Sequence, residues 1–100
     1  MRVLVAGSTG LAGTAIASAF EYQGQDVIRV NRSIVDLMNL EATQKFLNSA
    51  KPALVVDAAA KVGGIGANNS FPVEFLADNI RIQNNLMQAA HEADVKKFVF

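Results

Sequence analysis

The sequence contains no cysteine, which excludes disulfide bonds and metal sites built on thiolates. It also has no excess of either charge, because nine Lys and Arg residues are balanced by nine Asp and Glu residues. Proteins that bind nucleic acids or membrane surfaces carry clustered Lys and Arg, so we expect neither partner. No apolar run approaches the roughly 20 residues that a membrane helix needs. Together these absences favour a cytoplasmic protein without a bound metal.

The residues that are present favour a packed domain, since 51% of the 100 residues are hydrophobic. The amino terminus enters a Gly-rich turn almost at once, so we expect no signal peptide. Short apolar, β-branched runs predict strands over residues 3–6, 27–30, 53–58 and 97–100. Helical spacing predicts helices over residues 11–23, 39–51 and 72–93, with a Gly-rich loop over residues 59–70.

Three residues mark the ends of these helices. Gly24 stops the first helix, Asn39 caps the second, and Pro72 suits the first turn of the third. In the third helix we expect an apolar stripe made of Leu76, Ile80, Met87 and Ala90, with Phe75 and Leu86 beside it.

The resulting order, β-α-β-α-β-α-β, predicts an α/β fold of the Rossmann type, a doubly wound parallel sheet. The last predicted strand reads as a central strand that further strands would flank. We therefore expect residues 1–100 to be the N-terminal part of an NAD(P)-binding domain, with the remainder and a substrate domain following.

Three glycines follow the first predicted strand directly, at the spacing G-x-x-G-x-x-G. Gly7 lets the chain turn sharply, Gly10 lets a pyrophosphate approach the backbone, and Gly13 lets the helix pack closely on the sheet. The N-terminus of the following helix offers unpaired N–H groups to the phosphates. Three glycines alone are a weak signal, but their strand-turn-helix context makes dinucleotide binding the favoured interpretation.

The end of the second strand distinguishes the two nicotinamide cofactors. An acid there binds the ribose 2′-hydroxyl of NAD, whereas an Arg accommodates the 2′-phosphate of NADP. Asn31 and Arg32 follow this strand, and Asp26 precedes it and therefore lies at the wrong end. The planar fork of donors on Arg32 suits a phosphate, so the sequence favours NADP(H).

Two further segments belong to the candidate cofactor site. Asp36 can accept from the adenine amino group while Leu37 covers the ring. Small residues where the third strand ends would let the cofactor lie against the backbone. The candidate cofactor-binding residues are Gly7, Ser8, Thr9, Gly10, Leu11, Ala12, Gly13, Arg32, Asp36, Leu37, Ala58, Ala59, Ala60 and Lys61.

With these residues in place, the chain resembles the extended short-chain dehydrogenases/reductases, and within them the GDP-L-fucose synthases. The most specific stretch is Ala-Ala-Lys-Val-Gly-Gly-Ile, which begins at Ala59. The resemblance continues through the third predicted helix, for example at Asn84 and Asn85. One departure is the glycine turn, where the family often carries a basic residue and this chain has Ser8 and Thr9. The NADP prediction therefore depends more heavily on Arg32.

The resemblance implies an NADPH-dependent epimerase-reductase. Its substrate would be GDP-4-keto-6-deoxy-D-mannose, epimerised at C3 and C5 and then reduced at C4 to GDP-L-fucose. The family's catalytic Ser, Tyr and Lys lie after the fourth strand. Here Tyr22 is the only Tyr, and Asp26 rather than Lys stands four positions later, so we assign no catalytic residue. A homodimer of the full-length protein is compatible with the sequence, which does not itself give the oligomeric state.

Two alternatives stay open at this stage. One is another extended short-chain enzyme, such as a UDP-sugar epimerase or dehydratase that keeps NAD tightly bound. The other is a non-catalytic dinucleotide-sensing module of the NmrA-like kind, which the same glycine turn would serve.

Overall fold

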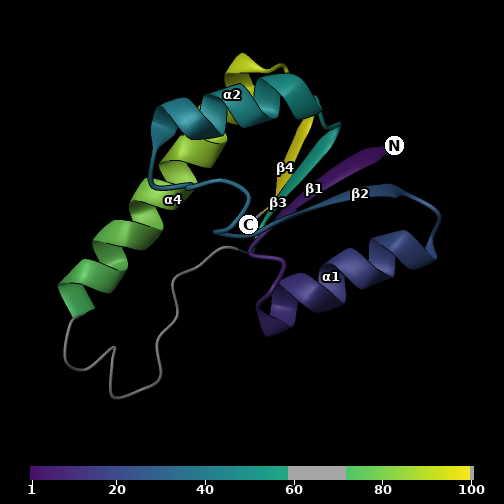
Figure 1. Ribbon diagram of the computed structural model, residues 1–100, viewed down its shortest axis with the longest axis horizontal. Helices are drawn as coiled ribbons and strands as arrows, with labels where there is room; N and C mark the ends of the chain where they lie inside the picture. The colour runs from purple at the N-terminus through teal and green to yellow at the C-terminus, as the bar shows by residue number, and fades with distance from the viewer. Residues whose placement is uncertain (59–71, 100) are drawn as a thin grey trace.

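The computed structural model describes residues 1–58 and 72–99 of the chain. Within them, strands and helices alternate as the apolar pattern predicts, each predicted end lying at or next to the observed one (Figure 1). The strands are β1 (Arg2–Ala6), β2 (Asp26–Val30), β3 (Leu54–Asp57) and β4 (Lys97–Val99). The helices are α1 (Leu11–Tyr22), α2 (Leu40–Ala50) and α4 (Pro72–Glu92).

The strands of the described residues form one parallel sheet in the order β2-β1-β3-β4. The chain crosses from β1 to β2 on one side and then returns past β1 to β3 on the other. α1 covers one face of the sheet, and α2 and α4 cover the opposite face (Figure 1). This arrangement confirms the doubly wound, Rossmann-type fold. It also places a topological switch point at the carboxyl ends of β1 and β3, where ligands bind in such sheets.

From Val3 to Ala6 the central strand β1 is apolar, because both of its faces are buried there. Leu4 and Ala6 pack with Val55 into the core beneath α2 and α4. Val3 and Val5 point the other way and pack against α1. All four of these side chains are completely buried, which explains why residues 3–6 show no alternation of apolar and polar residues.

The predicted helix signals act as expected. Asn39 caps α2, its side-chain oxygen accepting from the Ala42 N–H at 3.0 Å. The same helix ends at Ala50, and its C-cap Lys51 has a left-handed φ of 48° and directly precedes Pro52. Gly24 follows α1 with φ 82°, a conformation that favours glycine.

The apolar stripe predicted for α4 is largely wrong. Leu76, Ile80 and Met87 are 62%, 48% and 42% exposed, whereas Leu86 and Ala90 are buried. The helix carries two apolar faces, and the one that packs against α2 and β3 contains Leu86, Ala89 and Ala90. Periodicity predicts that a helix has an apolar face, but it does not decide which of two such faces meets the sheet.

The apolar residues of α1 do not all pack on the sheet either. Leu11 is 93% exposed, and the helix instead packs on the sheet through Ala17, with Ile16 and Phe20 beside it.

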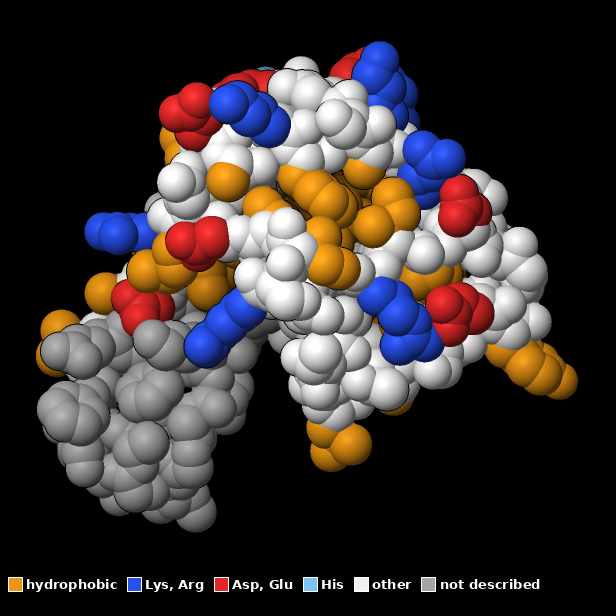
Figure 2. All heavy atoms as spheres, in the orientation of Figure 1, with side chains coloured by type: hydrophobic (Ala, Val, Ile, Leu, Met, Phe, Trp, Pro, Cys, Tyr) orange, Lys and Arg blue, Asp and Glu red, His pale blue; other side chains and the backbone are white. Residues whose placement is uncertain are grey.

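Apolar side chains also reach the surface between α2 and the edge strand β2 (Figure 2). None of the helices in the described residues is long and apolar enough to cross a membrane.

Candidate functional site

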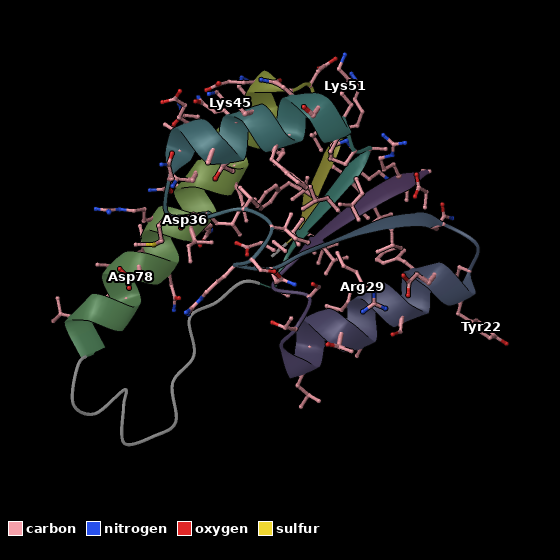
Figure 3. All side chains as sticks on the ribbon, viewed as in Figure 1. Tyr22, Arg29, Asp36, Lys45, Lys51 and Asp78 are labelled. Atoms are coloured by element: carbon pink, nitrogen blue, oxygen red, sulfur yellow. The ribbon has the colours of Figure 1, made fainter. Side chains whose placement is uncertain are left out.

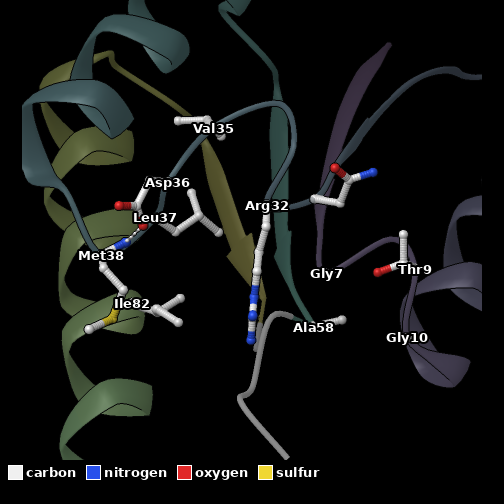
Figure 4. Close-up of a pocket in the computed structure, with 11 residues that line it drawn as sticks. Gly7, Thr9, Gly10, Arg32, Val35, Asp36, Leu37, Met38, Ala58 and Ile82 are labelled. Atoms are coloured by element: carbon white, nitrogen blue, oxygen red, sulfur yellow. Dashed lines mark hydrogen bonds between the residues drawn. The ribbon is translucent and has the colours of Figure 1, made fainter.

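A pocket of about 610 Å³ opens where the carboxyl ends of β1, β2 and β3 meet (Figure 4). Its volume is within the roughly 300–1,000 Å³ that is typical of small-molecule sites. It lies at the switch point of the sheet, between the glycine turn on one side and the segment after β2 on the other. The lining residues are Gly7, Thr9, Gly10, Asn31, Arg32, Val35, Asp36, Leu37, Met38, Ala58 and Ile82.

The three glycines of the turn meet different requirements. Gly7 has φ 76°, which a side chain would disfavour. A Cβ on Gly13 would lie 2.0 Å from the Gly7 carbonyl oxygen, so this glycine permits close packing on the turn itself rather than on the sheet. Gly10 has an ordinary φ of −74°, and its Cβ would meet no described atom closer than 3.5 Å. The protein's own packing therefore does not require glycine at position 10.

The turn is held in place before any ligand arrives. The N–H groups of Gly7 and Ser8 both donate to the carbonyl oxygen of Val30, at 2.9 and 3.0 Å. The Thr14 hydroxyl donates to the Ser8 carbonyl at 2.7 Å. Because Ser8 is 5% exposed and its N–H is engaged, its side chain and amide are not presented to the pocket, unlike Thr9.

The N-terminus of α1 has no side-chain cap among the residues that the structure describes. Its N-cap is Gly10, which makes no side-chain capping bond, and the first turn contains no acidic residue. The first N–H groups of a helix have no acceptor within the helix, so those of Leu11, Ala12 and Gly13 can receive an external one. Such an end carries a partial positive charge and favours an anion. The geometry therefore suits a diphosphate against the backbone at Gly10.

Arg32 enters the pocket from the turn that follows β2. The Asn31 carboxamide oxygen accepts from the Ser33 N–H at 2.8 Å, which shapes this turn around Arg32. The guanidinium extends into the space between Ile82 and the glycine turn (Figure 4). Within residues 1–58 and 72–99, no carboxylate pairs with it. A second anionic group could therefore bind here, apart from the diphosphate.

Asp36 and Leu37, which the sequence predicts to contact adenine, form the opposite wall of the pocket. The Asp36 Oδ1 atom accepts from the Met38 N–H at 3.0 Å, and the Asp36 carbonyl accepts from the Asn39 N–H at 3.0 Å. Leu37 is half-buried and packs against the core, leaving part of its side chain to the pocket. One carboxylate oxygen of Asp36 thus shapes the turn, and the other stays available for a ligand donor.

Ala58 lines the pocket where β3 ends, and its N–H donates to the Ala6 carbonyl at 3.0 Å. Its small side chain leaves room for a ligand between β3 and the glycine turn. The other predicted residues of this segment, Ala59, Ala60 and Lys61, lie outside the described residues.

The described residues hold no arrangement typical of a dehydrogenase's catalytic Tyr and Lys. Tyr22 is 95% exposed at the far end of α1 and points away from the molecule (Figure 3). Glu21 and Arg29, which lie away from the pocket, have shifted pKa values. A hydrogen bond from Arg29 lowers the pKa of the Glu21 carboxyl, and the same contact raises the pKa of Arg29.

Sequence reasoning missed four residues that line the pocket. Asn31, Val35 and Met38 come from the segment whose other members were predicted, and their adjacency to Arg32 and Asp36 was the available signal. Ile82 comes from α4, and no signal distinguished it from a core residue. Its position shows that the third helix contributes to the pocket as well as to the core.

Comparison with protein families matches residues 3–100 to the NAD dependent epimerase/dehydratase family. Among curated proteins, the chain is 39% identical over 100 residues to GDP-L-fucose synthase 1 of Arabidopsis thaliana. It is also 39% identical over 100 residues to GDP-L-fucose synthase of Escherichia coli strain K12. Each match covers 99% of this chain and 31% of the relative, so the chain spans about a third of the relatives' length.

Among solved structures, the chain is similar to MlghC, a GDP-mannoheptose C4 reductase from Campylobacter jejuni with NADP bound. The TM-score is 0.90 at 33% sequence identity, and the match covers 99% of this chain and 32% of that one. The similarity thus extends over the sheet, the glycine turn and the segment that carries Arg32.

Proposed function

Because this chain belongs to the NAD dependent epimerase/dehydratase family, we propose that it forms the cofactor-binding part of an NADPH-dependent enzyme that acts on a GDP-sugar. The proposed reaction converts GDP-4-keto-6-deoxy-D-mannose to GDP-L-fucose, by epimerisation at C3 and C5 and reduction at C4. The observation that carries the cofactor assignment is that Arg32 and the N-terminus of α1 line one pocket, and that within residues 1–58 and 72–99 neither has an anionic partner. The 39% identity to GDP-L-fucose synthases supports the substrate.

The described residues fit the diphosphate, the 2′-phosphate and the adenine ring of NADPH. The diphosphate would accept hydrogen bonds from the first-turn N–H groups of α1, close to Gly10. Arg32 would hold the 2′-phosphate, since its fork of donors matches a phosphate's oxygens. Asp36 would accept from the adenine amino group while Leu37 covers the ring. When bound, the nicotinamide supplies the hydride for the reduction at C4.

NADP is preferred over NAD in this proposal because the position after β2 holds no acid. Asp26, the acid of β2, bonds to Arg2 at the opposite end of the strand, with a separation of 3.0 Å. An acid at the pocket would repel the 2′-phosphate, whereas Asn31 and Arg32 do not. Ser8 is buried and Thr9 is uncharged, so Arg32 supplies the cationic side chain of the described pocket lining.

A second candidate substrate comes from the structural comparison. The similar MlghC protein is a C4 reductase of a GDP-mannoheptose, and its match has a TM-score of 0.90. Reduction of a different GDP-4-keto-sugar, without epimerisation, would use the same cofactor site.

The test is NADPH oxidation by the full-length protein, followed by absorbance, with GDP-4-keto-6-deoxy-D-mannose as substrate. We expect turnover and GDP-L-fucose as the product identified by chromatography. Reactions without sugar and with NADH are the controls. Turnover with a GDP-4-keto-heptose but not with the deoxymannose substrate would select the second candidate. Turnover with UDP-sugars alone would reject both.

A further inference from the structure

The most informative buried polar side chain outside the glycine turn is that of Asn85, in the middle of α4. It is 9% exposed, and its Nδ2 atom donates to the Leu37 carbonyl oxygen at 2.8 Å. A backbone carbonyl can only accept, so the carboxamide must turn its nitrogen toward Leu37. This hydrogen bond joins two elements that lie 48 residues apart in the sequence.

Leu37 belongs to the wall of the pocket that faces the glycine turn. The bonds from Met38 and Asn39 to Asp36 shape this wall locally, but they do not orient it relative to the sheet. Val35 and Leu37 also pack on the core, yet apolar contacts are non-directional. The Asn85 bond adds direction, because it fixes the plane of the peptide that follows Leu37.

The same face of α4 reaches the pocket directly. Ile82 precedes Asn85 by three positions, so the two side chains lie on one side of the helix. Ile82 lines the pocket, and Asn85 holds the backbone of the neighbouring wall. α4 therefore contacts the pocket through one residue and orients it through another.

We propose that Asn85 is a positioning residue that holds Asp36 and Leu37 in the arrangement that receives the adenine ring. The inference rests on the proposed function, because it takes the occupant of the pocket to be NADPH. Without the bond, the segment would sample other orientations. The apparent affinity would then fall by the fraction of molecules that remain in the binding arrangement.

The test compares two cofactors on the full-length protein and its Asn85→Leu variant, which keeps the side chain's size and removes the donor. One is NADPH, and the other is its analogue with hypoxanthine in place of adenine, which lacks the amino group assigned to Asp36. Binding is measured by calorimetry. The matched control is Asn84→Leu, the same change at an exposed neighbouring position.

We expect Asn85→Leu to weaken NADPH binding about tenfold, the effect of one lost hydrogen bond and its unpaired carbonyl. In Asn85→Leu, the affinity for the hypoxanthine analogue should fall much less, so that the difference in affinity between NADPH and the analogue becomes smaller. Asn84→Leu should leave both affinities unchanged. A role in folding alone would weaken both cofactors equally. If the Leu variant does not fold, Asn85→Ser, whose hydroxyl is too short to reach Leu37, gives the same comparison.

Equal affinities in Asn85→Leu and the unsubstituted protein, or equal losses for the two cofactors, would overturn this inference alone. Failure of the unsubstituted protein to bind NADPH would overturn the proposed function, and the inference with it.

Discussion

The arginines at the two ends of the sheet differ in whether they bond to other groups of the described residues. At the amino end, Arg2 bonds to Asp26 at 3.0 Å and to the Ala50 carbonyl at 2.7 Å. At the carboxyl end, Arg32 pairs with no carboxylate among residues 1–58 and 72–99, and α1 begins without a side-chain cap. The two arginines flank strands of one parallel sheet, so sheet geometry alone does not explain the difference.

The difference indicates that the carboxyl end of the sheet, rather than the amino end, is suited to bind a ligand. Donors that already bond within the chain contribute to the fold, whereas donors left open at a pocket can bind an external acceptor. The open end also has its backbone held in place by Val30 and Thr14, so that little rearrangement is needed on binding. We expect substitutions at the two ends to separate accordingly into effects on stability and effects on affinity.

The largest expected effect is a loss of stability, from a substitution that disrupts the glycine turn at the carboxyl end of the sheet. In Gly13→Ala, the new methyl group would lie 2.0 Å from the Gly7 carbonyl oxygen, and backbone must move to admit it. We expect the free energy of unfolding of the full-length protein to fall by about 3 kcal/mol, as for severe overpacking. Denaturant unfolding measures this loss. A variant as stable as the parent would show that the turn tolerates a side chain here.

Gly10→Ala should sharpen the contrast by reducing affinity while the fold persists. Its methyl would meet no described atom within 3.5 Å, but it would occupy the approach of the diphosphate. We expect NADPH binding to weaken about a hundredfold, corresponding to about two lost hydrogen bonds to a charged group. The free energy of unfolding should change by less than about 1 kcal/mol, the cost of Ala at an N-cap. Calorimetry and denaturant unfolding on one sample test both statements.

Arg32→Ala should weaken NADPH binding by roughly 1–3 kcal/mol, because it removes a charged donor from the 2′-phosphate. NADH, which lacks this phosphate, should bind almost as before. Arg2→Ala at the amino end is the matched control and should leave both affinities unaltered. Equal losses for the two cofactors in Arg32→Ala would show that this residue does not recognise the phosphate. Titrations monitored by NADPH and NADH fluorescence supply the comparison.

The smallest expected effect is at the exposed pair of Glu21 and Arg29. Their hydrogen bond lowers the pKa of Glu21. The stabilisation that this hydrogen bond gives is therefore present at pH values above the ordinary carboxyl pKa of 4.5. It is lost as the pH falls through the lowered pKa of Glu21. Glu21→Gln should reduce the Tm slightly near neutral pH and not at all in strong acid. A difference that grows on acidification would contradict this sign. Cofactor affinity should not change.

The order and type of the elements could be predicted from the sequence because local signals mark them. Continuous apolar runs indicate strands buried on both faces, and Asn39, Pro52 and Gly24 act at the helix ends as their chemistry dictates. The same holds for the pocket residues next to these signals. The glycine turn and Arg32 closely follow strands, where ligands of parallel sheets bind, and Asp36 lies in the same segment as Arg32, between β2 and α2.

What could not be predicted depends on contacts between distant elements. The choice between the two apolar faces of α4 is made by α2 and β3, and no local pattern records it. Ile82 and Asn85 resemble ordinary helix residues until α4 is placed against the segment after β2. Ser8, by contrast, belongs to the predicted motif but is buried, because its amide bonds to Val30.

The shared carbonyl of Val30 has a consequence for how cofactor preference can change. It anchors Gly7 and Ser8 to the last residue of β2, immediately before Asn31 and Arg32. In the proposed site, the glycine turn that would bind the diphosphate of either nicotinamide cofactor is thus anchored to the residue just before those that would distinguish NADP from NAD. Exchanging the two residues after the anchor could convert one specificity into the other without disturbing what both cofactors share.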